Sequence, residues 1–324
     1  MRSRPLLVVA IVALLALLPV APVGATTDAP NTCSGATAAK PLNTWIADAV
    51  EPSGDVDWFR FTTASNRYAL VTLGKLAANY TLELYSSCGT KLATSARSGV
   101  QYEEIYRYLP AGAYRVRVSG VSGAHSATNY QVRFRSLAEG VLMLSYRTWT
   151  DSGNLYVVGE ILNNTAQTRK WVKALVTFYD ASSQQLGSTY FTYSHIDLMK
   201  PRTRSPAGPR YAPIPVGYHH YRVTAAPGTV TDNIPVGNLK VTPGTPYDTS
   251  WNRHYPGTLT NNNGFALTDA EVVVTLYNSS GGVVNADFDY PTTPIAAGAT
   301  VDFDIMVWDH YAGVNRYVFQ AEGE

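Results

Sequence analysis

The sequence predicts an all-β protein, built as three tandem β-sandwich domains behind a signal peptide. Three observations lead to this prediction. Beyond residue 25, apolar and polar residues alternate with a period of two, and β-branched and aromatic residues are frequent. Gly, Pro, Asn and Ser interrupt the alternation at short intervals, as turns between strands do. The second half of the chain repeats itself over the length of a whole domain.

The first 25 residues have the order of a secretory signal peptide. Arg2 and Arg4 precede an apolar run over 6–18, and small residues follow up to Ala25. Because a membrane-spanning helix needs about 20 apolar residues, we expect cleavage after Ala25 rather than a retained membrane anchor. No later segment is apolar enough to cross a membrane. The mature chain is therefore expected to be secreted, with no membrane span.

The charge balance limits the classes of partner, and the two cysteines bear on the disulfide expected of an exported chain. Taking Arg2 and Arg4 away from 25 basic side chains leaves 23 against 24 acidic ones. This balance predicts no nucleic-acid partner. In an exported chain, Cys33 and Cys88 predict one disulfide, and two buried thiols are the alternative. The bond would close a loop of 55 residues and stabilise the fold by about 4 kcal/mol.

The internal repeat sets the domain organisation. Gly159, Asn163 and the segment 176–179 recur at an offset of 98 as Gly257, Asn261 and the segment 274–277. A period of that size holds a complete sandwich rather than one turn of a solenoid. We therefore expect a signal peptide over 1–25 and sandwich domains over 26–136, 137–232 and 233–324.

Domain one carries a family resemblance. Residues 55–61 read Asp-Val-Asp-Trp-Phe-Arg-Phe, and they are followed by Leu-Glu-Leu-Tyr at 82–85, Ala-Gly-Ala-Tyr-Arg-Val-Arg-Val at 111–118 and Tyr130. This succession resembles the bacterial pre-peptidase C-terminal (PPC) domain. The resemblance implies a jelly-roll-like accessory β-sandwich without catalytic activity. It also implies a calcium site at Asp55 and Asp57, although residues 36–43 replace the acidic stretch that the family has upstream.

Each repeat of the second half resembles the FxLYD domain. The first copy has Val-Thr-Phe-Tyr-Asp at 176–180, and the second has Val-Thr-Leu-Tyr-Asn at 274–278. The resemblance implies an immunoglobulin-like β-sandwich for each copy. It transfers no activity, because the family has none that is settled.

A basic face is predicted in domain one. Along 114–118, aromatic and aliphatic residues alternate with arginines, and 130–135 repeats the arrangement, so each strand has one wet face. If the two strands are neighbours, their arginines form a ladder that could hold an acidic glycan or a wall polymer. Alternatively, Glu83, Glu103 and Glu104 neutralise it. The predicted anion-binding residues are Arg115, Arg117, Arg133 and Arg135.

Motifs of known chemistry are absent from the sequence. It contains no zinc-protease, phosphate-binding or EF-hand motif, so no catalytic residues are predicted. Besides Asp55 and Asp57, two further pairs, Asp287/Asp289 and Asp302/Asp304, put two acids on one face of a strand. If these strands form a hairpin, four acids share a face and could bind a hard cation. A solvated edge that resists aggregation is the alternative interpretation.

These observations predict a function class and no specific partner. We expect a non-catalytic secreted or cell-surface binding protein, without a cofactor unless calcium binds, whose partner is an extracellular protein or a glycan. The alternative is a carbohydrate-binding or glycan-processing protein. It is favoured by the 22 tyrosines, because aromatic rings can stack on sugars.

Overall fold

The computed structural model describes residues 28–233, 236–308 and 313–324. Within these ranges the chain consists of antiparallel strands and one short 3-10 turn, Val121–Gly123, which confirms the predicted all-β class. No helix in the described part is long and apolar enough to cross a membrane. The predicted signal peptide lies outside the described residues.

The first sandwich packs two four-stranded sheets against each other, with strand orders β1-β8-β3-β6 and β2-β7-β4-β5. Alternation along the strands sends one side chain in two into a shared core, which includes Phe59, Val71, Val116 and Phe134. The strands are β1 (Trp45–Asp48), β2 (Val56–Thr63), β3 (Arg67–Gly74), β4 (Tyr80–Ser87), β5 (Thr90–Ser95), β6 (Glu103–Leu109), β7 (Gly112–Gly120) and β8 (Tyr130–Leu137).

The second sandwich faces a β15-β10-β9 sheet against a β13-β12-β16 sheet, with a small β14-β11-β17 sheet beside them. Leu155, Val157 and Phe178 are buried between the two larger sheets. The strands are β9 (Gly140–Asp151), β10 (Asn154–Asn164), β11 (Arg169–Lys170), β12 (Lys173–Tyr179), β13 (Gln185–Tyr193), β14 (Leu198–Met199), β15 (Arg204–Pro213), β16 (His220–Ala226) and β17 (Thr229–Val230).

The third sandwich follows the same plan. Its β20 pairs with β18, β19 and β23, and the β22-β21-β24 sheet covers the other side of the core. The strands are β18 (Leu239–Pro243), β19 (Tyr247–Asp248), β20 (Asn252–Asn261), β21 (Ala270–Tyr277), β22 (Val283–Asp289), β23 (Thr300–Trp308) and β24 (Arg316–Gly323).

The repeat in the sequence is also a repeat of structure, and two buried asparagines show it most directly. The amide of Asn163 donates to the carbonyls of residues 167, 199 and 200 at 2.8, 2.9 and 3.1 Å. The amide of Asn261 donates to those of 265, 295 and 296 at 2.8, 3.0 and 3.3 Å. Each asparagine therefore supplies hydrogen bonds that a buried loop backbone would otherwise lack.

The three sandwiches meet at one buried junction. Arg204 of β15 lies between Glu104 of β6, at 2.9 Å, and Glu160 of β10, at 3.6 Å. Glu160 is only 2 % exposed and also accepts a hydrogen bond from Tyr277 of β21. Burial raises the pKa of Glu160, and the Arg204 guanidinium is the main influence that lowers it. Arg204 therefore connects carboxylates of the first and second sandwiches, and Tyr277 links the third sandwich to Glu160.

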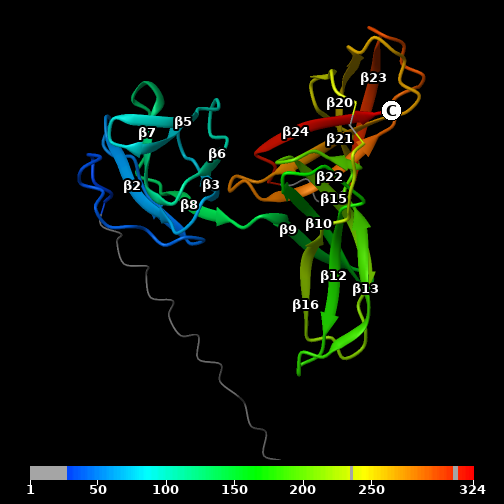
Figure 1. Ribbon diagram of the computed structural model, residues 1–324, viewed down its shortest axis with the longest axis horizontal. Coiled ribbons are helices and arrows are strands. Elements are labelled where there is room, and N and C mark those ends of the chain that lie inside the picture. The colour runs from blue at the N-terminus through cyan, green and yellow to red at the C-terminus, as the bar shows by residue number, and fades with distance from the viewer. Residues whose placement is uncertain (1–27, 234–235, 309–312) are drawn as a thin grey trace, which may run out of the picture.

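A second set of contacts joins the first sandwich to the third. The buried ring of Tyr102 packs on that of Tyr277 at 5.8 Å, and its hydroxyl accepts from Arg316 Nη1 at 3.0 Å. Asn315 Oδ1 accepts from the Tyr102 backbone N–H at 3.1 Å. In Figure 1 the chain passes from β8 through β9 into the second sandwich, while loops of the third lie beside the first. The boundaries 136/137 and 232/233 stay a prediction.

Candidate metal centre

Asp57 lies on the inward face of β2. It lies on the same side of the strand as Phe59 and Phe61, so the same periodicity that builds the core carries its carboxylate inside, where it is 0 % exposed. Asp57 Oδ2 accepts a hydrogen bond from the Tyr130 hydroxyl at 2.7 Å. Asp57 Oδ1 has no hydrogen-bond partner among the described residues. A buried carboxylate oxygen without a partner is costly and calls for a ligand.

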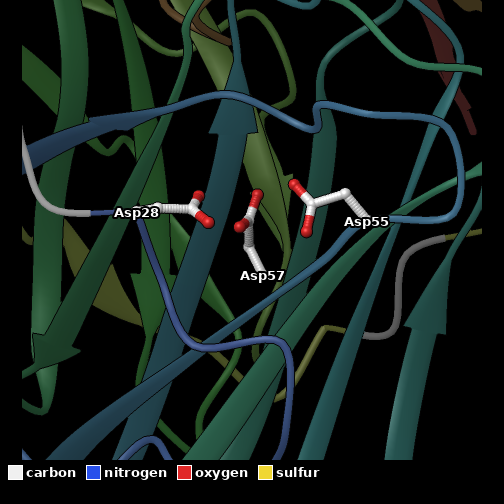
Figure 2. A group of neighbouring side chains, drawn as sticks. All are labelled: Asp28, Asp55 and Asp57. Carbon is white, nitrogen blue, oxygen red and sulfur yellow. The ribbon is translucent and has the colours of Figure 1, made fainter.

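Two further carboxylates meet Asp57. Asp55 is buried just before β2, and Asp28 is exposed at the start of the described chain. One oxygen of each acid lies within 4.8 Å of the other two, and Figure 2 shows the three carboxylates converging, Asp28 from one segment and Asp55 and Asp57 from another. The structure thus brings together the predicted Asp55 and Asp57, and adds Asp28, which the sequence analysis missed.

The segment that carries Asp28 is fixed by backbone hydrogen bonds. Trp58 N–H donates to the Pro30 carbonyl at 3.1 Å, and Ala29 N–H donates to Asp48 Oδ2 at 3.1 Å. The predicted Cys33–Cys88 disulfide is present and ties the same segment to the turn between β4 and β5. Asp28 is therefore held beside the pair from β2 by at least three links.

Burial and the neighbouring acids raise the pKa of Asp57. Burial is the main cause that raises the pKa of Asp57 to about 8, and the charges of Asp48, Asp55 and Asp28 add to it, against the Tyr130 hydrogen bond. Burial likewise raises the pKa of Asp48 and of Asp28. A bound cation would remove this repulsion, because it gives the ionised form an opposite charge at short range.

Calcium fits this donor set. Hard cations prefer carboxylate oxygens, and calcium takes six to eight of them in flexible geometry, with water completing the shell. Asp57 Oδ1 has no hydrogen-bond partner among the described residues, and Asp28 is open to solvent. Asp55 uses its oxygens to accept from Glu51 and Val56 N–H at 2.9 and 2.8 Å, which orients its carboxylate without occupying all its lone pairs.

The predicted arginine ladder is wrong. Arg115 and Arg117 lie on β7, whereas Arg133 and Arg135 lie on β8, and these strands belong to opposite sheets of the sandwich. Period-two alternation identifies an outward face but not the sheet that carries it. The two pairs therefore face away from each other and form no common anion-binding face.

The four arginines have local partners instead. Arg117 pairs with Glu83 at 3.0 Å, as the neutralising alternative expected. Arg115 Nε donates to the Cys33 carbonyl at 3.3 Å. Arg133 stacks 4.3 Å from the Trp45 ring, and Arg135 donates to the Leu144 carbonyl at 3.0 Å. Their roles are to hold the first sandwich and its link to the second.

The acid hairpin in the third sandwich is also wrong. Asp287 and Asp289 lie on β22, which pairs with β21, while Asp302 and Asp304 lie on β23, which pairs with β20. One acid of each pair still comes close, because Asp304 N–H donates to Asp289 Oδ2 at 2.9 Å. The Asp304 carboxylate accepts from the Tyr247 hydroxyl at 2.7 Å and contacts His254 Nδ1 at 2.9 Å. Among the described residues, the acids that lie close enough together to hold a metal ion are Asp28, Asp55 and Asp57.

A hollow of about 700 Å³ lies between the second and third sandwiches. Glu271 and Glu322 oppose each other there on β21 and β24. Both oxygens of Glu322 accept from the Asp197 backbone N–H, at 2.8 and 2.9 Å, and Glu271 lies 3.4 Å from His195 Nδ1. Burial raises the pKa of Glu322 to about 7. Both carboxylates thus serve contacts between the two sandwiches.

The known proteins that this chain resembles are found among solved structures. No family model matches the chain, and no curated protein matches it. The pre-peptidase C-terminal domain of a collagenase from Bacillus anthracis is 19% identical, with a TM-score of 0.25, over 29% of this chain and 90% of that chain.

Two larger enzymes are similar over more of the chain. A β-glucuronidase from Parabacteroides merdae is 9% identical, with a TM-score of 0.28, over 77% of this chain and 27% of that chain. A putative β-galactosidase from Bacteroides fragilis is 10% identical, with a TM-score of 0.26, over 74% and 34%. The chain therefore spans about a quarter to a third of these enzymes. Similarity at this level carries no argument about activity, and the FxLYD resemblance stays a prediction.

Proposed function

We propose that this chain is a non-catalytic extracellular binding protein whose first sandwich takes up calcium. The observation that carries the calcium part is the buried carboxylate of Asp57, which meets those of Asp28 and Asp55 and whose Oδ1 has no hydrogen-bond partner among the described residues. Binding there would stabilise the native chain by mass action, because the unfolded chain lacks the convergent site.

The arrangement of the other charged groups supports a binding role. The carboxylates Glu271 and Glu322 in the hollow between the second and third sandwiches serve contacts between these sandwiches, and Arg204 is enclosed between Glu104 and Glu160. Catalysis by paired acids needs a carboxylate free to meet substrate. What the chain offers a partner is instead the outer faces of three sandwiches held in one arrangement.

Calorimetric titration of calcium into the EDTA-treated mature protein, residues 26–324, tests the metal site. We expect one binding event, which Asp55→Asn and Asp57→Asn abolish and the exposed control Asp302→Asn leaves unchanged. Heat that is the same in all four proteins would refute the site.

Hydrolysis assays test the absence of catalysis. Chromogenic glycosides and a casein substrate should show no turnover above the buffer. Turnover that Glu271→Gln or Glu322→Gln removes would overturn the non-catalytic proposal and place an active site in the hollow.

A further inference from the structure

Two adjacent histidines lie at the outer end of the second sandwich. His220 is the first residue of β16 and the register partner of Tyr179, the last residue of β12. His219 precedes the strand, and its backbone N–H donates to the Tyr179 carbonyl at 2.9 Å. Figure 1 shows this end of β12 pointing away from the other two sandwiches. Because His219 is exposed and His220 is half-buried, a solute can reach the pair from solvent.

The two imidazole rings turn toward each other. Consecutive residues inside a strand project to opposite faces, which would keep such side chains apart. His219 lies one residue before β16, so its ring is not bound by that alternation. The Nδ1 atoms of the His219 and His220 rings are 3.4 Å apart, and the ring planes stand at 87° to each other. The start of the strand therefore brings two potential metal ligands together.

The spacing of these nitrogens suits one tetrahedral zinc ion. Zinc binds imidazole nitrogen at about 2.0–2.1 Å, so two ligands at the tetrahedral angle lie about 3.3–3.4 Å from each other. Neighbouring nitrogens around a square-planar copper(II) or nickel(II) ion at the same bond length would be only about 2.8–3.0 Å apart. The observed 3.4 Å therefore fits the tetrahedral spacing.

A hydrogen bond between the two rings is the alternative explanation of their closeness. One Nδ1–H would then donate to the other Nδ1, which requires the two rings to hold different tautomers. Hydrogen bonds from N–H groups to oxygen span about 2.7–3.2 Å, and the observed N···N distance is longer. The pair thus matches the zinc spacing more closely than that of a strong hydrogen bond.

Neighbouring side chains hold the pair in position. The Tyr179 ring stacks on His220, with centroids 5.2 Å apart and an interplanar angle of 12°. Tyr179 is itself held by the pairing of β12 with β16 and contacts the Arg222 guanidinium, which lies 5.5 Å from its ring centroid. A ligand that is already oriented loses less conformational freedom when an ion binds.

Asp180 adds a negative charge near the pair. Three hydrogen bonds end on its Oδ1, from Ser182 N–H at 2.8 Å, the Ser182 hydroxyl at 2.7 Å and Gln184 N–H at 2.9 Å. The Ser182 hydroxyl is the main influence that lowers the pKa of Asp180, and the nearby His220 adds to it. Asp180 therefore stays ionised, and its charge offsets that of Arg222 when a cation approaches.

We propose that His219 and His220 together bind one zinc ion through their Nδ1 atoms. Both rings would then carry their proton on Nε2, because a nitrogen bound to a metal cannot keep its own. Two protein ligands leave two tetrahedral positions, which water would fill. Imidazole suits zinc, whereas the carboxylates of Asp28, Asp55 and Asp57 suit calcium. The inference therefore goes beyond the proposed function and does not rest on it.

Calorimetric titration of zinc into the untagged mature protein, residues 26–324, tests the site. In an excess of calcium, which occupies the carboxylates of the first sandwich, we expect one zinc ion per chain. His219→Ala and His220→Ala should each weaken binding about tenfold or more, because each removes one of two protein ligands. Binding should also weaken as the pH falls, since protons compete for imidazole nitrogen.

The matched control is His125→Ala, which takes away an exposed imidazole of the first sandwich. It should bind zinc like the unaltered protein. Titrations without calcium should show the same loss in His219→Ala, so a failed calcium site does not affect the result. Equal zinc binding by His219→Ala and the unaltered protein, or no zinc binding at all, would overturn the inference.

Nitrogen-15 NMR of the histidine rings separates chelation by two rings from binding to one ring. Zinc should shift the Nδ1 resonances of both His219 and His220 together and leave their Nε2 atoms protonated. A shift confined to one ring, or shifts that saturate at different zinc concentrations, would refute a shared ion and favour the hydrogen-bonded pair.

Discussion

Asp57 gives the sharpest prediction, because replacing it should stabilise the metal-free protein and abolish the response to calcium. In Asp57→Asn the amide oxygen can still accept from the Tyr130 hydroxyl, but the variant carries no buried charge. The pKa of the Asp57 carboxyl is 3.8 unfolded and about 8 folded. Such a group favours folding most at low pH and loses that contribution as pH rises from about 4 to 8.

The size of the effect follows from these values. The free energy of unfolding falls by about 1.4 kcal/mol for each pH unit between 3.8 and 7. The total loss at pH 7 is about 4 kcal/mol. Asp57→Asn avoids this cost and should unfold at higher temperature than the unaltered protein in EDTA. A hundredfold excess of calcium over its Kd should stabilise only the unaltered protein, by about 2.7 kcal/mol.

Differential scanning calorimetry between pH 5 and 8.5, in EDTA and in calcium, measures both effects. The gap between the two proteins in EDTA should widen as pH rises, and calcium should narrow it. The exposed control Asp302→Asn should change neither quantity. If Asp57→Asn is less stable than the unaltered protein in EDTA at pH 8, the buried carboxylate is already compensated, and the reasoning is refuted.

Three further predictions concern stability. Arg204→Ala leaves Glu160 buried without its cation, so the substitution should lower the free energy of unfolding by about 3–5 kcal/mol and split one calorimetric transition into several. An unchanged thermogram would contradict this prediction. Between pH 4.5 and 7 the raised pKa of the partly exposed Glu322 should add a loss of about 2 kcal/mol of stability to that from Asp57, and Glu322→Gln should remove only this added part of the slope. Replacing Cys33 and Cys88 by Ser should cost about 4 kcal/mol in urea unfolding; equal midpoints would refute it.

The strands of the first sandwich were predictable from local pattern, and their assembly was not. Tyr114, Val116 and Val118 are buried on β7, as their alternation predicts. Neighbours in the sequence tend to pair, but in this sandwich β7 pairs with β2 and β4, and β8 with β1 and β3. Sheet membership depends on long-range pairing, which a period-two pattern does not encode.

Two of the three acids in the metal centre, Asp55 and Asp57, were predictable from the sequence, and Asp28 was not. Asp55 and Asp57 share a motif, so their spacing within one extended segment brings them together. Asp28 lies in a segment without regular structure, and backbone bonds such as that from Trp58 to Pro30 place it. An acid shortly before the first cysteine was the signal, and it becomes informative only once the disulfide is known to fix that segment.

Composition alone does not show which aromatic rings lie together. Abundant tyrosine suggested sugar recognition, but it did not say which rings share a surface. The register of β9, β10 and β15 brings Trp149, Tyr156 and Tyr211 side by side. Other large rings, such as Tyr80, Tyr130 and Tyr255, are buried in cores.

The paired asparagines bear on how the two repeats came to differ. Asn163 and Asn261 preserve the same loop framework in both copies, so a surface residue can change without disturbing it. Tyr277 became an assembly element, enclosed against Glu160, whereas its counterpart Tyr179 stacks on His220 at 5.2 Å away from the junction. The two copies thus keep the same internal brace while contributing different groups to one junction, Glu160 from the first and Tyr277 from the second.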